Sequence, residues 1–236
     1  SGYLPGYLAA PRASLPTLDD YVKKNTPKTS DPRSANWWQN YPKYAASLLK
    51  AWYGDNAKKE NDFGYSLVPK LDDGQDCTIL NMIDNMFEKK IKGLICIAQN
   101  PAGSLPNSNK VREALTNLDW IVHVNIFTNE TASFWKGPGM DPKNIKTEVF
   151  LLPAAASIEK QGSQANSGRW VQWKYEAAKA PGDAISTGDI VIRIVSKLKE
   201  LYKKDKKAAF PDPILNLKWD YTDDKGRFDP VKVART

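Results

Sequence analysis

Three short, largely apolar runs separated by helical patterns constrain the fold of this chain more than any other feature. The runs cover residues 94–98, 120–124 and 147–152, and polar residues or proline follow each of them. Such runs are typical of strands buried on both faces of a parallel sheet. Apolar residues recur at helical spacing over residues 75–90, 109–118 and 189–204. This alternation predicts an α/β fold with a parallel sheet flanked by helices.

Composition divides the 236 residues into three regions. Residues 1–74 are aromatic and proline-rich, and we expect helices near residues 17–20 and 34–53 that pack on the rest of the fold. Residues 75–205 contain the alternating pattern and form the predicted ligand-binding domain. Residues 206–236 are rich in proline and charge, which indicates an extended tail or linker. No apolar run approaches the roughly 18 residues of a membrane-spanning helix, so we expect no direct membrane insertion.

The chain is basic, with a formal net charge of +7. An excess of lysine and arginine suits an anionic cofactor, an acidic partner surface or a nucleic acid. No nucleic-acid-binding motif accompanies the charge, so we expect no nucleic-acid partner.

Polar residues at the ends of the predicted strands are candidates for a ligand site. Ligands of open parallel sheets bind at the carboxyl ends of the strands, near a switch in strand order. Gln99 and Asn100 follow the first run, Val124 and Asn125 end the second, and a loop follows Leu152. Ordinary turn residues would produce the same pattern, and the pattern alone leaves both interpretations open.

Familiar catalytic and phosphate-binding motifs are absent from the sequence. It contains no G-x-G-x-x-G, no phosphate-binding loop and no C-x-x-C. Cys96 lies inside an apolar run and is expected to be a buried structural thiol. Cys77 has no identifiable base beside it, and His123 is expected to be a core histidine. We therefore assign no catalytic and no metal-binding residue.

Two charged residues lie near the ends of predicted elements. Lys160 follows the third strand and could neutralise a phosphate, but the residue taken alone favours an ordinary surface lysine. Asp189 opens the last predicted helix, where aspartate is normally an N-cap or an acidic residue of the first turn. Its carboxylate would also suit the N1 and N2 donors of guanine.

Several segments together resemble the molybdopterin oxidoreductases of the dimethyl sulfoxide reductase family, and among these the large subunit of formate dehydrogenases. The motifs include Ala98-Gln99-Asn100-Pro101, Glu130-Thr131-Ala132 and Asn166-Ser167-Gly168-Arg169-Trp170. The similar segments, in chain order, cover residues 4–8, 34–42, 98–101, 124–127, 130–132, 134–135, 146–150, 152–154, 159–162 and 166–173.

The resemblance implies that the chain is an internal piece of a larger catalytic subunit. The piece would be the Rossmann-like domain that binds one of two molybdopterin guanine dinucleotides around tungsten or molybdenum. The [4Fe–4S] cysteines, the metal ligand and the catalytic histidine and arginine would lie outside it. In the family, cofactor contacts fall on the positions of five residues here, with Asn100 as a neighbouring candidate: Gln99, Val124, Asn125, Lys160 and Asp189. Many family members have Asp where this chain has Asn125.

The resemblance also implies a reaction and partners. The complete enzyme would oxidise formate to CO2 and pass two electrons to an iron–sulfur electron-transfer subunit, with a periplasmic location. A cytoplasmic location stays open. The alternatives are another oxidoreductase of the family, such as nitrate or polysulfide reductase, and a non-catalytic assembly module that docks an electron-transfer subunit.

Overall fold

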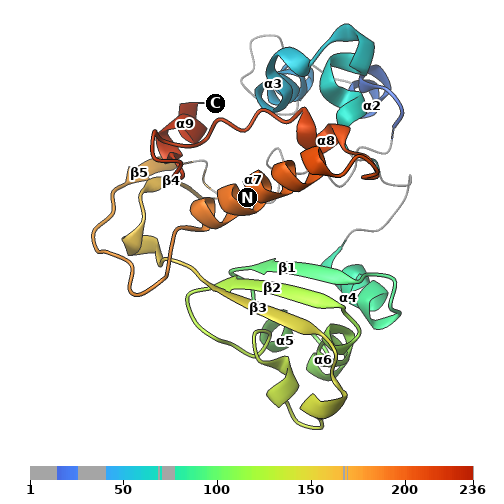
Figure 1. Ribbon diagram of the computed structural model, residues 1–236, viewed down its shortest axis with the longest axis vertical. Coiled ribbons are helices and arrows are strands. Elements are labelled where there is room, and N and C mark those ends of the chain that lie inside the picture. The colour runs from blue at the N-terminus through green and yellow to red at the C-terminus, as the bar shows by residue number, and fades with distance from the viewer. Residues whose placement is uncertain are drawn as a thin grey trace. The chain divides into compact units, whose positions relative to one another are not determined.

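A computed structural model describes residues 15–25, 41–68, 70, 78–166, 168 and 170–235. The chain divides into two compact units (Figure 1). One comprises residues 1–75, 164–172 and 192–236, and the other comprises residues 76–163 and 173–191. Cys77 and the motif segments at residues 4–8 and 34–40, all discussed above from the sequence, lie outside the described residues.

The second unit contains a parallel sheet of three strands in the order β1-β2-β3. The strands are β1 (Gly93–Ile97), β2 (Trp120–Asn125) and β3 (Glu148–Pro153). Leu94 pairs with Ile121, and Ile121 pairs with Val149. These side chains share one face of the sheet. The predicted α/β fold is confirmed, and each strand boundary lies within one residue of its predicted position.

The helices of this unit cover the face of the sheet that carries Leu94, Ile121 and Val149. They are α4 (Ile79–Phe87), α5 (Pro101–Ser104) and α6 (Ser108–Thr116), followed by short 3-10 turns at Phe134–Lys136, Pro142–Asn144 and Ser157–Glu159. Figure 1 shows α5 and α6 beside this face. The Thr78 hydroxyl accepts a hydrogen bond from the Asn81 amide at 3.4 Å and caps α4.

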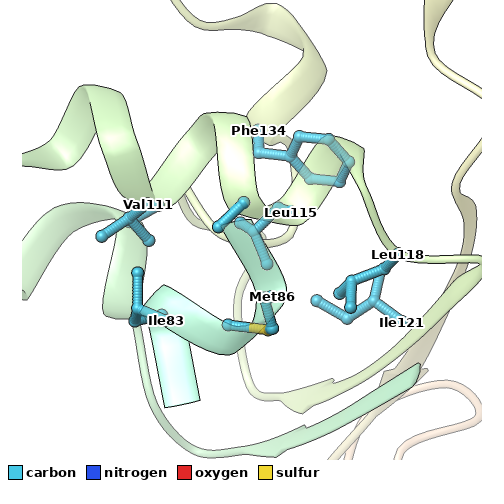
Figure 2. Packing of buried hydrophobic residues seen from close by; sticks show 9 residues of the cluster. Ile83, Met86, Val111, Leu115, Leu118, Ile121 and Phe134 are labelled. Atoms are coloured by element: carbon cyan, nitrogen blue, oxygen red, sulfur yellow. The ribbon is translucent and has the colours of Figure 1, made fainter. Parts of the chain in front are cut away.

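Apolar side chains from α4, α6 and β2 form the core between the helices and the sheet (Figure 2). Leu115, Ile121 and Phe134 are at most 1% exposed. The Thr147 hydroxyl donates to the carbonyls of Leu115 and Leu118, which joins the end of α6 to the start of β3. The core comprises Ile83, Met86, Ala102, Val111, Ala114, Leu115, Leu118, Ile121 and Phe134.

The opposite face of the sheet is less covered. Ile95 on β1 is 50% exposed, and Phe150 on β3 is 44% exposed. The sequence pattern predicted burial on both faces of the sheet. Five large apolar side chains of the described strands depart from that pattern: Ile95, Ile97, Trp120, Phe150 and Leu151.

The first unit contains α2 (Leu18–Asn25), α3 (Tyr41–Tyr53), the 3-10 segments Gly54–Asn56 and Lys59–Leu67, α8 (Asp212–Leu215) and α9 (Pro230–Arg235). Its core comprises Tyr21, Leu49, Tyr53, Tyr65, Leu67 and Val68. The helix expected near residues 17–20 is confirmed as α2. The Thr17 hydroxyl oxygen caps it by accepting from the Asp20 amide, and its hydroxyl donates to the Asp20 carboxylate.

Three further elements complete the described chain. β4 (Gly162–Ala165) pairs with β5 (Val171–Lys174), and α7 (Thr187–Lys204) has residues in both units. None of the helices in the described ranges is long and apolar enough to cross a membrane.

Candidate functional site

The predicted site residues at the ends of β1 and β2 lie along one edge of the sheet. The Ala98 amide donates to the Val124 carbonyl at 2.9 Å, and the Ala154 amide donates to the Asn125 carbonyl at 3.0 Å. These bonds continue the pairing just beyond the strands. Gln99, Asn100 and Asn125 are therefore presented at the carboxyl edge, where parallel sheets bind their ligands.

The same edge extends beyond β3 to the start of α7. Ala154 forms a parallel bridge with Ile185, and the Ala155 amide donates to the Ile185 carbonyl at 2.8 Å. Ser186 and then α7 follow directly in the chain. This pairing brings the first turn of α7, which contains Asp189, to the end of β3.

The turn after β1 is held by two buried groups. His123 Nε2 lies 3.2 Å from the Gln99 carbonyl oxygen, and Cys96 Sγ lies 3.5 Å from the same oxygen. His123 is 2% exposed, and burial lowers its pKa, so the neutral imidazole donates from Nε2. Burial raises the pKa of the Cys96 thiol. The predicted core roles of His123 and Cys96 are confirmed.

Ala98 adopts a left-handed backbone conformation with φ of 55°. The predicted strand therefore ends at Ile97, and the chain turns before Gln99. The left-handed region is unfavourable for a residue with a Cβ atom. The hydrogen bonds of Ala98 to β2 and of the Gln99 carbonyl to His123 hold this turn in place.

Asn100 links the loop after β1 to the loop after β2. Its Oδ1 accepts from the Thr131 hydroxyl at 2.9 Å and from the Thr131 amide at 3.2 Å. Its Nδ2 donates to Glu130 Oε2 at 2.6 Å, and this bond is the main reason that the pKa of Glu130 is lowered. The fully buried Thr131 oxygen also accepts from the Ala102 amide. In this structure Asn100 positions two loops.

A small pocket opens at the ends of β2 and β3. Its volume is about 170 Å³, which is below the 300 Å³ or more that is usual for an enclosed ligand site. It can therefore hold part of a large ligand. Asn125 lines it, with its Oδ1 accepting from the Ile126 amide at 2.8 Å, and Phe127 on its rim is 76% exposed. The lining residues are His123, Asn125, Ile126, Phe127, Thr128, Ala132, Leu151, Leu152 and Pro153.

Lys160 lies beside the first turn of α7. Its Nζ is 3.5 Å from the Thr187 hydroxyl oxygen, and its carbonyl accepts from the Lys174 ammonium at 2.8 Å. Burial, and then the charge of Lys174, lower the pKa of Lys160. The Lys160 ammonium next to the helix N-terminus, with the Lys174 ammonium close to Lys160, favours an anion, because nearby negative charge would stabilise both ammonium groups and the helix dipole.

Asp189 takes part in a reciprocal cap at the start of α7. Its Oδ2 accepts from the Ser186 hydroxyl at 2.6 Å, and its amide donates to the Ser186 oxygen at 3.0 Å. Ser186 is therefore the residue that caps α7, and Asp189 is an acidic residue of the first turn, the second of the two ordinary roles expected for it. A guanine contact would use the same carboxylate that accepts from Ser186. Val124 is 1% exposed and its carbonyl is bonded to Ala98, so it shapes the strand end from within.

Sequence reasoning did not identify Lys174, Phe127 or the role of Glu130. Lys174 lies on a strand fourteen residues after Lys160, and only the fold brings the two together. Glu130 belongs to a motif noted in the sequence, but its bond to Asn100 spans 30 residues. No cluster of histidine, cysteine and acidic side chains suited to a metal ion is found within the described ranges.

Comparison with known proteins gives a consistent set of relatives. No protein-family model matches the chain. It is 52% identical over 234 residues to the formate dehydrogenase subunit alpha of Megalodesulfovibrio gigas, and the matched residues make up 98% of this chain. It is 49% identical over 232 residues to the formate dehydrogenase 2 subunit alpha (cytochrome c-553) of Nitratidesulfovibrio vulgaris, again covering 98% of the chain.

A third relative is the nitrate-inducible formate dehydrogenase major subunit of Escherichia coli, 40% identical over 222 residues and 92% of this chain. The match covers 22% of each of these three proteins, so the chain spans about a fifth of the length of the relatives. The chain is thus similar, over nearly all its length, to one segment of formate dehydrogenase alpha subunits.

Proposed function

Starting from this similarity, we propose that the chain is an internal segment of the catalytic alpha subunit of a formate dehydrogenase that depends on tungsten or molybdenum. Within that subunit, the segment binds one molybdopterin guanine dinucleotide. The observation that carries the proposal is the 52% identity to a formate dehydrogenase alpha subunit over 98% of the chain. The polar carboxyl edge of the sheet supports it independently, because that edge is where dinucleotides bind in folds of this class.

The residues at this edge fit the chemistry of the proposed cofactor. A guanine dinucleotide carries an anionic pyrophosphate and a base rich in hydrogen-bonding groups. Lys160 supplies positive charge at the start of α7, and Lys174 supplies a second positive charge close to Lys160. Asn125 and Asp189 supply amide and carboxylate groups for the ribose and the guanine.

The chain itself contributes binding, orientation and electrostatics. The cofactor, when bound, supplies the two-electron redox chemistry of formate oxidation. Lys160 and Lys174 offset the charge of the pyrophosphate. His123 and Asn100 fix the turn after β1, so that the Gln99 side chain keeps its position at the edge. We assign no reacting side chain to this segment.

The resemblance also supports finer proposals for the complete enzyme. A second dinucleotide, the metal ligand, the catalytic histidine and arginine, and a [4Fe–4S] cluster are assigned to other parts of the subunit. An iron–sulfur subunit is the proposed electron acceptor, and the periplasm is the proposed location. The two region boundaries, near residues 75 and 205, remain proposals as well.

Formate-dependent reduction of a viologen dye by the purified complete subunit tests the proposed activity. We expect dye reduction with formate and, in parallel assays, no dye oxidation with nitrate or polysulfide. Turnover of nitrate or polysulfide in place of formate would assign the segment to another oxidoreductase of the same kind. A folded, complete preparation that lacks both redox activity and guanine nucleotide would identify an assembly module that docks an electron-transfer subunit.

A further inference from the structure

The turn that ends at Lys160 is held by hydrogen bonds to its backbone. It comprises residues 157–160, between β3 and β4. The Ile158 carbonyl accepts from the amides of Ala177 and Ala178 at 2.8 and 3.2 Å. The Ile158 side chain is 62% exposed, so burial of apolar surface there contributes little to holding the turn. The position of Lys160 therefore depends mainly on polar contacts.

The Lys174 ammonium makes two further contacts to this turn. It donates to the Ser157 carbonyl and, at 2.8 Å, to the Lys160 carbonyl. One side chain thus joins the first and the last residue of the turn. Lysine has three N–H donors, and backbone carbonyls use two of them here. A methionine at position 174 would fill much of the same space but could not make these bonds.

Electrostatic repulsion between two lysine side chains opposes this arrangement, and the hydrogen bonds to the turn offset it. Burial, and then the positive charge of Lys174, lower the pKa of Lys160. Two ammonium groups on flexible side chains would move apart if nothing held them. The partial negative charge of the Ser157 and Lys160 carbonyls stabilises the Lys174 ammonium beside the turn. The contacts of Lys174 are therefore those of a group that fixes the turn.

The direction of the turn decides where the Lys160 side chain points. Lys160 Nζ lies 3.5 Å from the Thr187 hydroxyl oxygen, although the two residues are 27 positions apart in the chain. Thr187 is the first residue of α7. A change in the direction of the turn would carry the Lys160 ammonium away from the start of this helix. Contacts that fix residues 157–160 therefore also fix the positive charge beside α7.

We infer that Lys174 is a positioning residue of the proposed dinucleotide site: it holds the turn of residues 157–160 through two carbonyls, and the turn places the Lys160 ammonium at the start of α7 for a phosphate. The inference rests on the proposed function, because the dinucleotide supplies the phosphate. The competing role of Lys174 is a direct contact to a phosphate through its third N–H group. The two roles differ in whether Lys174 acts through Lys160.

A double-mutant cycle in the complete subunit separates these roles. The rate at which bound guanine nucleotide is lost during dialysis is measured as GMP for the wild type, Lys160→Met, Lys174→Met and the double variant. We expect Lys174→Met to lose nucleotide roughly three to ten times faster than the wild type, as for one or two lost hydrogen bonds. In the Lys160→Met background, the same substitution is expected to add no further acceleration. Equal acceleration in both backgrounds, or none in either, would overturn the inference.

Lys179→Met is the matched control, because Lys179 lies five residues further along the same segment and its side chain is 91% exposed. We expect this variant to keep its nucleotide as the wild type does. Hydrogen exchange of the Ala177 amide, which donates to the turn, reports the local effect. We expect this exchange to accelerate in Lys174→Met and not in Lys179→Met. Equal nucleotide loss from the two variants, or unchanged exchange at Ala177 in Lys174→Met, would contradict the positioning role.

Acylation of the unsubstituted subunit provides a second measurement, because Lys174→Met could fail to fold. Hydrogen bonds from a charged group to two carbonyls are expected to slow the reaction of Lys174 with a lysine-acylating reagent at least about tenfold relative to Lys179. Mass spectrometry gives both rates, and equal rates would overturn the inference. The GMP content of the wild type is scored separately. Its absence would contradict the proposed function, whereas a normal content with additive effects in the cycle would contradict only the role of Lys174.

Discussion

Asn100 Nδ2 lies 2.6 Å from Glu130 Oε2, and this hydrogen bond joins the loop after β1 to the loop after β2. The Asn100 side-chain oxygen Oδ1 completes the link by accepting from the Thr131 hydroxyl. A side chain that joins two strand-end loops controls the shape of the proposed binding edge.

Replacing Asn100 with alanine is expected to loosen both loops. The substitution leaves the buried Thr131 hydroxyl without its acceptor, which costs about 1–3 kcal/mol. The Ala102 amide, which donates to Thr131 at 2.9 Å, is the local reporter. We expect its hydrogen exchange to accelerate in Asn100→Ala and not in Asn109→Ala, a change at an exposed position of α6. Unchanged exchange at Ala102 in the Asn100 variant would contradict this account.

His123 gives the chain a pH-dependent stability below neutrality. Burial lowers its pKa from the ordinary 6.5, so the unfolded chain binds a proton at a higher pH than the folded chain. The free energy of unfolding therefore decreases as the pH falls below 6.5, and it levels off once the pH is below the folded pKa. Above pH 6.5 the group contributes no pH dependence.

Urea unfolding of the wild type and of His123→Gln, compared between pH 7.5 and 5, isolates this effect. Glutamine can still donate to the Gln99 carbonyl, but it does not titrate. We expect the difference in stability between the two proteins to change with pH only below 6.5, in favour of the variant. Parallel pH profiles would show that the imidazole titrates alike in the folded and unfolded chain.

Lys160 is expected to retain the nucleotide through its charge. Lys160→Met keeps the length of the side chain and removes the ammonium group, while Lys143→Met makes the same change at an exposed position. Loss of one charged contact to a phosphate costs about 1.5–3 kcal/mol, or roughly a tenfold to hundredfold weaker binding. We expect the bound guanine nucleotide of the complete subunit to fall after gel filtration only in the Lys160 variant. Equal retention in both variants would place the phosphates elsewhere.

Asp189 has two proposed roles that a pair of variants can separate. Ser186→Ala removes both hydrogen bonds of the cap and keeps the carboxylate, whereas Asp189→Ala removes the carboxylate and keeps the bond from the backbone amide of residue 189 to the Ser186 oxygen. If the carboxylate binds guanine, nucleotide retention falls clearly further in Asp189→Ala than in Ser186→Ala. If Asp189 acts only as a cap, the two variants retain the nucleotide equally.

The three parallel strands and the helices α4 and α6 of the second unit could be predicted because each carries a local signal, whereas the short α5 was not predicted. The apolar run before Gln99 marks β1, and the helical spacing from Ile79 to Met86 marks α4. Both patterns are visible within one element, and the structure confirms both.

The connections between elements could not be predicted in the same way. Asn100 and Glu130 are 30 residues apart, and the bond between Lys174 and Lys160 depends on how the chain returns beside α7. The left-handed Ala98 was also unexpected, because alanine gives no local signal for that conformation. The residue types at the strand ends indicated where a ligand could bind, and the fold was needed to show which of them hold the loops in place.

The guanine nucleotide content of the complete subunit tests the central claim most directly. Acid hydrolysis releases GMP from molybdopterin guanine dinucleotide, and the released GMP is quantified against the protein. The account predicts about two GMP per subunit, one of them bound by this segment. The absence of GMP from a folded, complete and formate-oxidising preparation would contradict it.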